Sequence, residues 1–89
     1  MVRRTVELVN RLGLHARAAA KFVHVASRFS SEVLVRNDHE EVNGKSILGL
    51  LLLAAPCGTR LTICARGQDE QEALDALEAL IAQRFGEEE

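Results

Sequence analysis

The sequence predicts an α+β fold in which one four-stranded antiparallel sheet is covered on one face by three helices. Two observations predict this fold. Apolar residues alternate at period 2 in some segments and recur at helical spacing in others, in the order strand, helix, strand, strand, helix, strand, helix (βαββαβα). Turn-forming residues separate these segments closely, and one antiparallel sheet with its helices on one side satisfies that order with short connections. No repeat or linker interrupts the pattern, so residues 1–89 are predicted to form a single domain.

Four of these elements are predicted in the first half of the chain. Alternating apolar positions predict a strand from Val2 to Val9, and the turn-forming residues 10–13 follow it. From Ala16 to Phe29 apolar residues recur at helical spacing, which predicts an amphipathic helix. The short β-branched segment from Glu32 to Arg36 predicts a second strand, and Glu40 to Asn43 a brief third.

The second half of the chain contains the other three elements. Ser46 to Leu53 is so rich in leucine that periodicity alone does not separate helix from strand, but the serine at its start favours a helix. Thr59 to Ala65 predicts the fourth strand, and Glu70 to Arg84 is the clearest helix. Gly86 and the glutamates at 87–89 are expected to form a solvated tail. The predicted buried stripe of the last helix is Ala73, Leu74, Ala76, Leu77, Leu80 and Ile81.

Composition and charge argue against several classes of protein. The formal net charge is −2 and the isoelectric point is about 5.9, whereas a sequence-independent nucleic-acid binder carries a basic face. Cys57 and Cys64 are too few for a disulfide scaffold, so reduced thiols are expected. The longest apolar run, Leu50 to Ala55, is far shorter than the roughly 20 residues that span a bilayer. We therefore expect a cytoplasmic protein with no nucleic-acid partner and no membrane insertion.

The segment most informative about function is Gly13 to Ala20. It places His15 at the start of the predicted first helix, directly after a glycine-containing turn. A helix N-terminus has unsatisfied N–H groups and the positive end of the helix dipole, so it would stabilise a phosphoryl group on the His15 ring. Imidazole is a competent nucleophile, and the Arg17 guanidinium can add a charge-assisted hydrogen bond. On residue types alone, the alternative that His15 only caps the helix or is exposed by chance stays open.

The motif Gly-Leu-His-Ala-Arg at residues 13–17, followed by small residues, closely resembles that of the HPr family of phosphotransferase-system carriers. Residues 45–47 (Lys-Ser-Ile), 58–59 (Gly-Thr) and 67–70 (Gly-Gln-Asp-Glu) are similar to further family landmarks. The resemblance therefore covers essentially the whole chain. It implies an open-faced β-sandwich of four strands and three helices, the same order that periodicity predicts.

The resemblance implies a phosphoryl carrier and not a turnover enzyme. It implies that His15 accepts a phosphoryl group on Nδ1 from phosphorylated enzyme I and donates it to an enzyme IIA-type domain, with Arg17 assisting the transfer. No cofactor is predicted, because Gly44-Lys45-Ser46 lacks the earlier glycine of a nucleotide-binding phosphate loop, where His39 stands. Donor and acceptor are therefore expected to be proteins.

One position departs from the family pattern. The family usually has proline directly after the arginine, where this chain has Ala18. Proline suits the first turn of a helix because its φ is preorganised and the missing N–H has no helical partner there. Alanine is an excellent helix former, so the helix and the carrier role are expected to survive, with an altered rate of transfer.

Ser46 is predicted to be the N-cap of the second helix. The resemblance adds that many family members are phosphorylated at this serine by a dedicated ATP-dependent kinase. Ser46 is therefore a candidate regulatory phosphoserine, and an HPr kinase/phosphorylase is a candidate partner. A phosphate at a helix N-terminus is electrostatically tolerated, so regulation can act by changing the surface without unfolding it.

A docking surface is predicted beside His15. The family uses the exposed side of the second helix, together with the area around the histidine, to bind its partners, and an exposed apolar patch suits that role. We expect a monomer, because a relay must expose one face to successive partners. His24 and His39 lack metal-ligand spacing, so no metal site is predicted. The residues assigned to the docking surface are Ala16, Ala20, His24, Ile47, Leu48 and Leu51.

Two alternatives stay open. Val33 to Asp38 and the phenylalanine followed by an acidic end are similar to nitrogen-related carriers of the same family, whereas Gly44-Lys45-Ser46 looks more like the sugar branch. The alternative from another class is a small α+β module that binds a ligand or a protein with His15 unmodified, because a fold alone does not fix a function.

Overall fold

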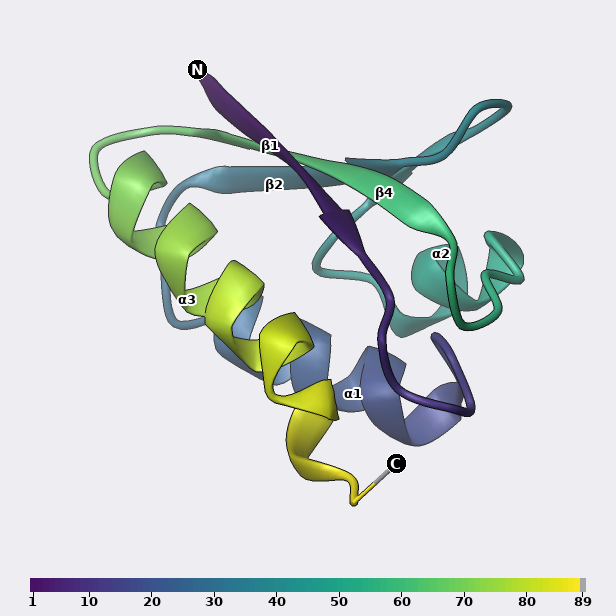
Figure 1. Ribbon diagram of the computed structural model, residues 1–89. Coiled ribbons are helices and arrows are strands. Elements are labelled where there is room, and N and C mark those ends of the chain that lie inside the picture. Colours follow the sequence, from purple (N-terminus) through teal and green to yellow (C-terminus); the bar gives the residue numbers. More distant parts are fainter. Residues whose placement is uncertain (89) are drawn as a thin grey trace.

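The computed structural model describes residues 1–88 and has the predicted α+β architecture (Figure 1). Its four strands form one sheet in the order β1-β4-β2-β3, and each neighbouring pair is antiparallel. The predicted fold class and element order are both confirmed. The strands are β1 (Val2–Glu7), β2 (Glu32–Arg36), β3 (Glu41–Asn43) and β4 (Arg60–Arg66).

Three α-helices cover one face of this sheet and leave its other face open (Figure 1). Helix α3 packs on β1 and β4, helix α1 packs beside α3, and the short α2 lies next to α1 and β3. Within residues 1–88, no helix has the length and apolar character needed to cross a membrane. The helices are α1 (Ala16–Ala26), α2 (Ile47–Leu52) and α3 (Glu70–Ala82), and a tight turn, η1 (Arg84–Gly86), follows α3.

The hydrophobic core lies between the sheet and the helices, and strand alternation explains its composition. In β4 the predicted inward face, Leu61, Ile63 and Ala65, is buried. Antiparallel pairing places Ile63 opposite Val35 of β2 and Leu61 opposite Val6 of β1, so buried side chains meet on one face across three strands. A slip of one residue would turn these side chains to the open face, so the burial pattern fixes the register.

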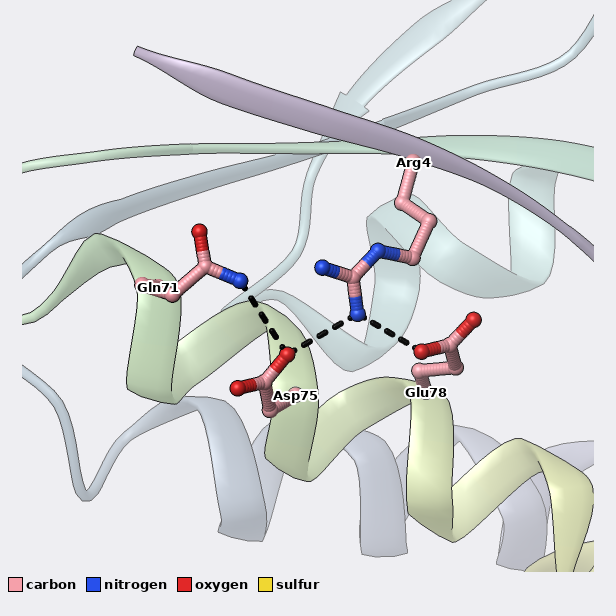
Figure 2. Close-up of polar contacts among 4 residues, drawn as sticks. All are labelled: Arg4, Gln71, Asp75 and Glu78. Carbon is pink, nitrogen blue, oxygen red and sulfur yellow. Dashed lines mark hydrogen bonds and ion pairs between the residues drawn. The ribbon is translucent and has the colours of Figure 1, made fainter.

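Arg4 forms ion pairs between β1 and α3 (Figure 2). Its side chain reaches from β1 to α3, where Nη1 donates to Asp75 Oδ1 at 2.9 Å and to Glu78 Oε1 at 2.6 Å. Gln71 Nε2 also donates to Asp75 Oδ1, at 3.2 Å. The hydrogen bonds from Arg4 and Gln71 hold the pKa of Asp75 below its ordinary value. The cluster is largely solvent-exposed, so it orients α3 and contributes little net stability.

The ends of the helices differ from the prediction. Helix α1 ends at Ala26, because Arg28 and Phe29 donate to carbonyls three residues back and tighten the last turn. Helix α3 ends at Ala82, and the chain then turns through Arg84 and Phe85 with φ of 58° and 55°. The predicted solvated tail, Gly86 and the glutamates at 87–89, is wrong at Glu87, which is partly buried. Phe85, which precedes the predicted tail, is 1% exposed. Glu89, also assigned to that tail, lies outside the described residues.

Candidate functional site

A glycine turn places His15 at the start of α1. Gly13 has φ of +66°, which glycine adopts without strain, and its N–H donates to Asn10 O at 3.1 Å. A Cβ at this position would lie 2.5 Å from Ala55 O, so the backbone has no room for a larger residue. The next N–H, of Leu14, donates to that same carbonyl at 2.9 Å. The loop before His15 is therefore fixed against the loop that precedes β4.

His15 is the N-cap residue of α1, but its ring does not cap the helix. Its backbone is extended, with φ of −80° and ψ of 179°, and the side chain makes no capping hydrogen bond. The N–H of Ala19 donates to His15 O at 2.8 Å, so the N–H groups of residues 16–18 precede the first intrahelical bond. These N–H groups and the helix dipole make the end of α1 favourable for an anion next to the ring.

The ring of His15 contacts a residue from the other end of the chain. Glu87 Oε2 lies 2.5 Å from His15 Nε2, and Asn10 Nδ2 donates to Glu87 Oε1 at 3.1 Å. Asn10 is fully buried and also donates to Gly13 O at 2.7 Å, so the carboxylate is tied to the turn that positions His15. Sequence reasoning missed this contact and placed Glu87 in solvent. No local signal could have revealed it, because 72 positions separate the two residues.

The charge state of Glu87 sets the tautomer of His15. Partial burial raises the pKa of Glu87, but hydrogen bonds from Asn10 and His15 and the charge of Lys21 outweigh burial, so the pKa lies below its ordinary value. The carboxylate is therefore ionised at neutral pH and can only accept a hydrogen bond. Nε2 of His15 must supply the proton. In the neutral ring, Nδ1 is then the nitrogen with the free lone pair.

His15 lies in an open hollow of about 540 Å³ that also contains Arg17. Arg17 is exposed on the first turn of α1, as its predicted role requires. The described residues thus bring together a ring nitrogen, a helix N-terminus and guanidinium groups, an arrangement suited to a phosphoryl group. The hollow is lined by Arg11, Leu12, His15, Arg17, Glu87 and Glu88.

Ala18 does not disturb the start of α1. Ala18 is fully buried in the first turn of α1. Its N–H precedes the first intrahelical hydrogen bond, so the helix has the same intrahelical hydrogen bonds with alanine here as it would have with proline. The expectation that the helix forms with alanine at this position is confirmed.

Ser46 is the N-cap of α2, as predicted. Its Oγ accepts a hydrogen bond from the N–H of Gly49 at 3.0 Å, and its side chain is partly exposed. Next to it, Lys45 Nζ donates to Phe29 O at 2.7 Å, which ties the start of α2 to the turn after α1. Ser46 lies outside the hollow that contains His15, because it is not among the residues that line it.

The residues assigned to docking are all exposed and belong to two adjacent helices. Ala16, Ala20 and His24 are exposed on α1. On α2, Leu48 is 70% exposed, and Ile47 and Leu51 are also solvent-exposed. Leu52, which the sequence did not single out, is 62% exposed on the same short helix. Four large apolar side chains on one six-residue helix form an apolar surface of the kind that binds other proteins.

A sheet covered on one side by three helices, with a histidine and an arginine at an open helix N-terminus, defines a small protein suited to carrying a phosphoryl group. Comparison with known proteins gives the family. The family described as "PTS HPr component phosphorylation site" matches residues 2–83, and the chain belongs to this phosphocarrier family. Members of the family are carriers, not turnover enzymes.

Relatives match over nearly the whole chain. The phosphocarrier protein HPr of Cupriavidus necator is 49% identical over 87 residues, which cover 98% of each chain. The crystal structure of HPr from Thermoanaerobacter tengcongensis has a TM-score of 0.96 and 47% identity, with full coverage of both chains. Crh of Bacillus subtilis, whose crystal structure is described as a dimer with a swapped domain, is 48% identical with a TM-score of 0.76 and covers 94% of this chain and 97% of its own.

Proposed function

We propose that His15 accepts a phosphoryl group on Nδ1 from phosphorylated enzyme I and donates it to an enzyme IIA-type domain. The position of the His15 ring at the open N-terminus of α1, in one hollow with Arg17, carries this proposal. The N–H groups at the start of α1 hydrogen-bond the phosphoryl oxygens, and Arg17 adds a charge-assisted bond. Stabilisation by exposed groups is modest, which suits a carrier because the phosphoryl group must also leave.

The exposed apolar side chains of α2 and the neighbouring face of α1 dock the successive partners. Leu48 has the largest exposed fraction of the α2 set, and Ala16 and Ala20 offer small side chains that let a partner approach the His15 hollow. An apolar patch beside a charged reaction site provides affinity without binding the phosphoryl group itself. Replacing Leu48 by a charged residue is expected to slow transfer without changing the chemistry at His15.

Ser46 is a regulatory phosphorylation site for an HPr kinase/phosphorylase. A phosphate there would lie at the N-terminus of α2, where the helix dipole tolerates negative charge, and next to the exposed Ile47 and Leu48. The modification would place a double negative charge at the edge of the apolar docking surface. It is therefore expected to weaken docking of partners that bind by apolar contact, with α2 still folded.

The chain acts as a cytoplasmic monomer in the sugar branch of the system or its regulation, and the nitrogen branch is the alternative. One exposed face that serves several partners in turn favours a monomer. The dimer with a swapped domain described for Bacillus subtilis Crh makes the oligomeric state a direct test. Light scattering during size-exclusion chromatography is expected to give the mass of one chain, and the mass of two would contradict this part of the proposal.

Phosphorus NMR tests the chemistry. The protein is phosphorylated with enzyme I, Mg²⁺ and phosphoenolpyruvate, and its spectrum is expected to contain one acid-labile signal of the Nδ1-phosphohistidine type. Adding an enzyme IIA domain is expected to remove that signal. A signal of the Nε2 type, or one that persists in the presence of active IIA domains from both branches, would contradict the assignment.

A further inference from the structure

The two edges of the sheet differ in length and in what lies beside them. Strand β3 forms one edge, is three residues long and has α2 packed next to it. Strand β1 forms the opposite edge, is six residues long and, within residues 1–88, pairs only with β4. Proteins usually shorten or cover such an edge, because its outward N–H and C=O groups can bind another strand. The longer edge at β1 is therefore a candidate binding surface.

Backbone alternation shows which groups face this edge. Both the N–H and the C=O of Leu8 bind the backbone at residues 58–59, with N···O distances of 2.9 and 2.7 Å, so they point toward β4. In an antiparallel pair, successive residues turn these groups to opposite sides. The N–H and C=O groups of Thr5 and Glu7 therefore point away from β4, toward the edge. Their side chains lie on the open face of the sheet, since the Arg4 side chain points to α3 (Figure 2).

A groove of about 320 Å³ lies between this edge and α3. Its apolar wall includes Ile81 and also Val9, which is 40% exposed just after the end of β1. The carboxylates of Glu7 and Glu78 line the same groove, and the described residues that line it include no lysine or arginine. The groove is therefore apolar and acidic. Its other lining residues are Thr5, Val6 and Ala82.

The basic side chains near these two carboxylates lie outside the groove. Arg4 binds Glu78 from the helix-covered face of the sheet, and 45% of the Glu78 side chain stays exposed. Arg60 lies opposite Glu7 on β4, on the side of β1 away from the edge. A ligand that adds to the edge therefore meets negative charge, and its complement is a basic side chain.

We propose that the outer edge of β1 binds an extended segment of a partner protein in which basic and aliphatic residues alternate. The segment adds a strand to the sheet through the backbone groups of Thr5 and Glu7. Residues directly opposite one another share a face of the sheet, so a basic residue opposite Glu7 meets its carboxylate on the open face. The next residue of the segment projects to the other face, where an aliphatic side chain covers the apolar wall of the groove.

This surface is separate from the one that serves phosphoryl transfer. The β1 edge is opposite the edge that packs beside α2, and the groove shares no described lining residue with the hollow that contains His15. A partner bound at β1 leaves α1 and α2 accessible. One protein can therefore recruit the carrier while another exchanges a phosphoryl group with it. This consequence rests on the proposed function, whereas binding at the edge does not.

The test uses the full chain and a synthetic peptide of alternating lysine and valine with both ends blocked. In a nitrogen-15 NMR titration, the peptide is expected to shift the amides of residues 3–9 and 78–82 and to leave those of α2 unchanged. The same peptide with glutamate in place of lysine is expected to bind about fivefold more weakly or worse, because attraction to exposed carboxylates becomes repulsion. A peptide N-methylated on the residues that face β1 is expected not to bind, because it cannot form the backbone ladder.

Variants of the chain test strand addition and charge separately. Thr5→Pro removes an N–H that β4 does not use, and an edge strand tolerates proline where the N–H faces solvent, so this variant is expected to fold and not to bind. Thr5→Val is its matched control, because it loses the hydroxyl 3.3 Å from that of Thr62 and keeps the N–H. Glu7→Gln is expected to weaken binding about threefold, the effect of one exposed ion pair. Glu72→Gln, an exposed position on α3 outside the groove, is expected to change nothing. Circular dichroism checks that each variant is folded.

Several outcomes would overturn the proposal. No peptide shifts, shifts confined to α1 and α2, or equal binding of the lysine and glutamate peptides would each do so. Full binding of the N-methylated peptide, or by a folded Thr5→Pro, would exclude strand addition. Sedimentation without peptide that gives a dimer, abolished by Thr5→Pro, would assign the edge to a second copy of the chain instead.

Phosphorylation by active enzyme I in saturating lysine peptide separates this proposal from the proposed function. Unchanged phosphorylation is expected. A wild type that binds the peptide at β1 but takes no phosphoryl group, with or without peptide, would overturn the proposed function alone. A peptide that binds at β1 and blocks phosphorylation would overturn simultaneous binding of two partners.

Discussion

Phe85→Ala tests whether the C-terminal turn is part of the folded core. The Phe85 side chain is 1% exposed and packs in the main hydrophobic cluster, although the residue follows the last helix. Truncating a buried phenylalanine to alanine costs about 3 kcal/mol or more, through lost transfer free energy and the cavity left behind. The residue also keeps its unfavourable left-handed φ of 55°, so the backbone gains no compensation. For a domain of this size, 3 kcal/mol lowers Tm by roughly 12–24 °C.

The assay is urea unfolding followed by far-ultraviolet circular dichroism, because the chain has no Trp or Tyr to report by fluorescence. Leu52→Ala is the matched control, since Leu52 is a large apolar residue that is 62% exposed. Its free energy of unfolding is expected to change by about 0.5 kcal/mol or less. A loss below about 1 kcal/mol for Phe85→Ala would refute the burial of this turn and the delivery of Glu87 that depends on it.

Three further predictions concern stability. Gly13→Ala is expected to cost about 2 kcal/mol or more in urea unfolding, because it adds a Cβ 2.5 Å from Ala55 O at a left-handed φ, and a loss near zero would contradict the turn geometry. Ser46→Ala is expected to cost about 1 kcal/mol through loss of the helix cap, and an unchanged urea midpoint would contradict it. The pKa of Asp69 is lowered from 3.8 to about 2, chiefly by the hydroxyl of Ser31 and also by backbone N–H groups. As the pH falls through that interval, the unfolded state binds the proton first, so stability is lost from about pH 4 to pH 2. Asp69→Asn has no carboxyl group to protonate at this position and is expected to lose less stability over that range than the wild type.

Much of the fold could be predicted because its information is local. Alternation placed Leu61, Ile63 and Ala65 on the buried face of one strand, and the antiparallel partners have the same period. Periodicity did not separate helix from strand in the leucine-rich segment from Ser46 to Leu53. The capping side chain of Ser46 favoured a helix, and that prediction is confirmed.

The candidate site was predictable only in part. His15 and Arg17 lie within three positions of one another, so their placement at a helix N-terminus follows from local pattern. Glu87 reaches His15 only because α3 runs back beside α1 and the chain then reverses at residues 84–86. In the sequence, a glutamate followed by two more predicts a solvated tail. The contacts of Glu87 with Asn10 and His15 depend on tertiary packing, which the local sequence does not show.

Intact-mass analysis after incubation with enzyme I, Mg²⁺ and phosphoenolpyruvate tests the central claim most directly. His39→Ala is the matched control for His15→Ala, because His39 is an exposed histidine outside the docking surface. We expect one added, acid-labile phosphoryl group on the wild type and on His39→Ala, and none on His15→Ala. A labelled His15→Ala would contradict His15 as the acceptor. An unlabelled wild type beside an active cognate enzyme I would contradict the carrier role and leave a binding module with an unmodified histidine as the better description.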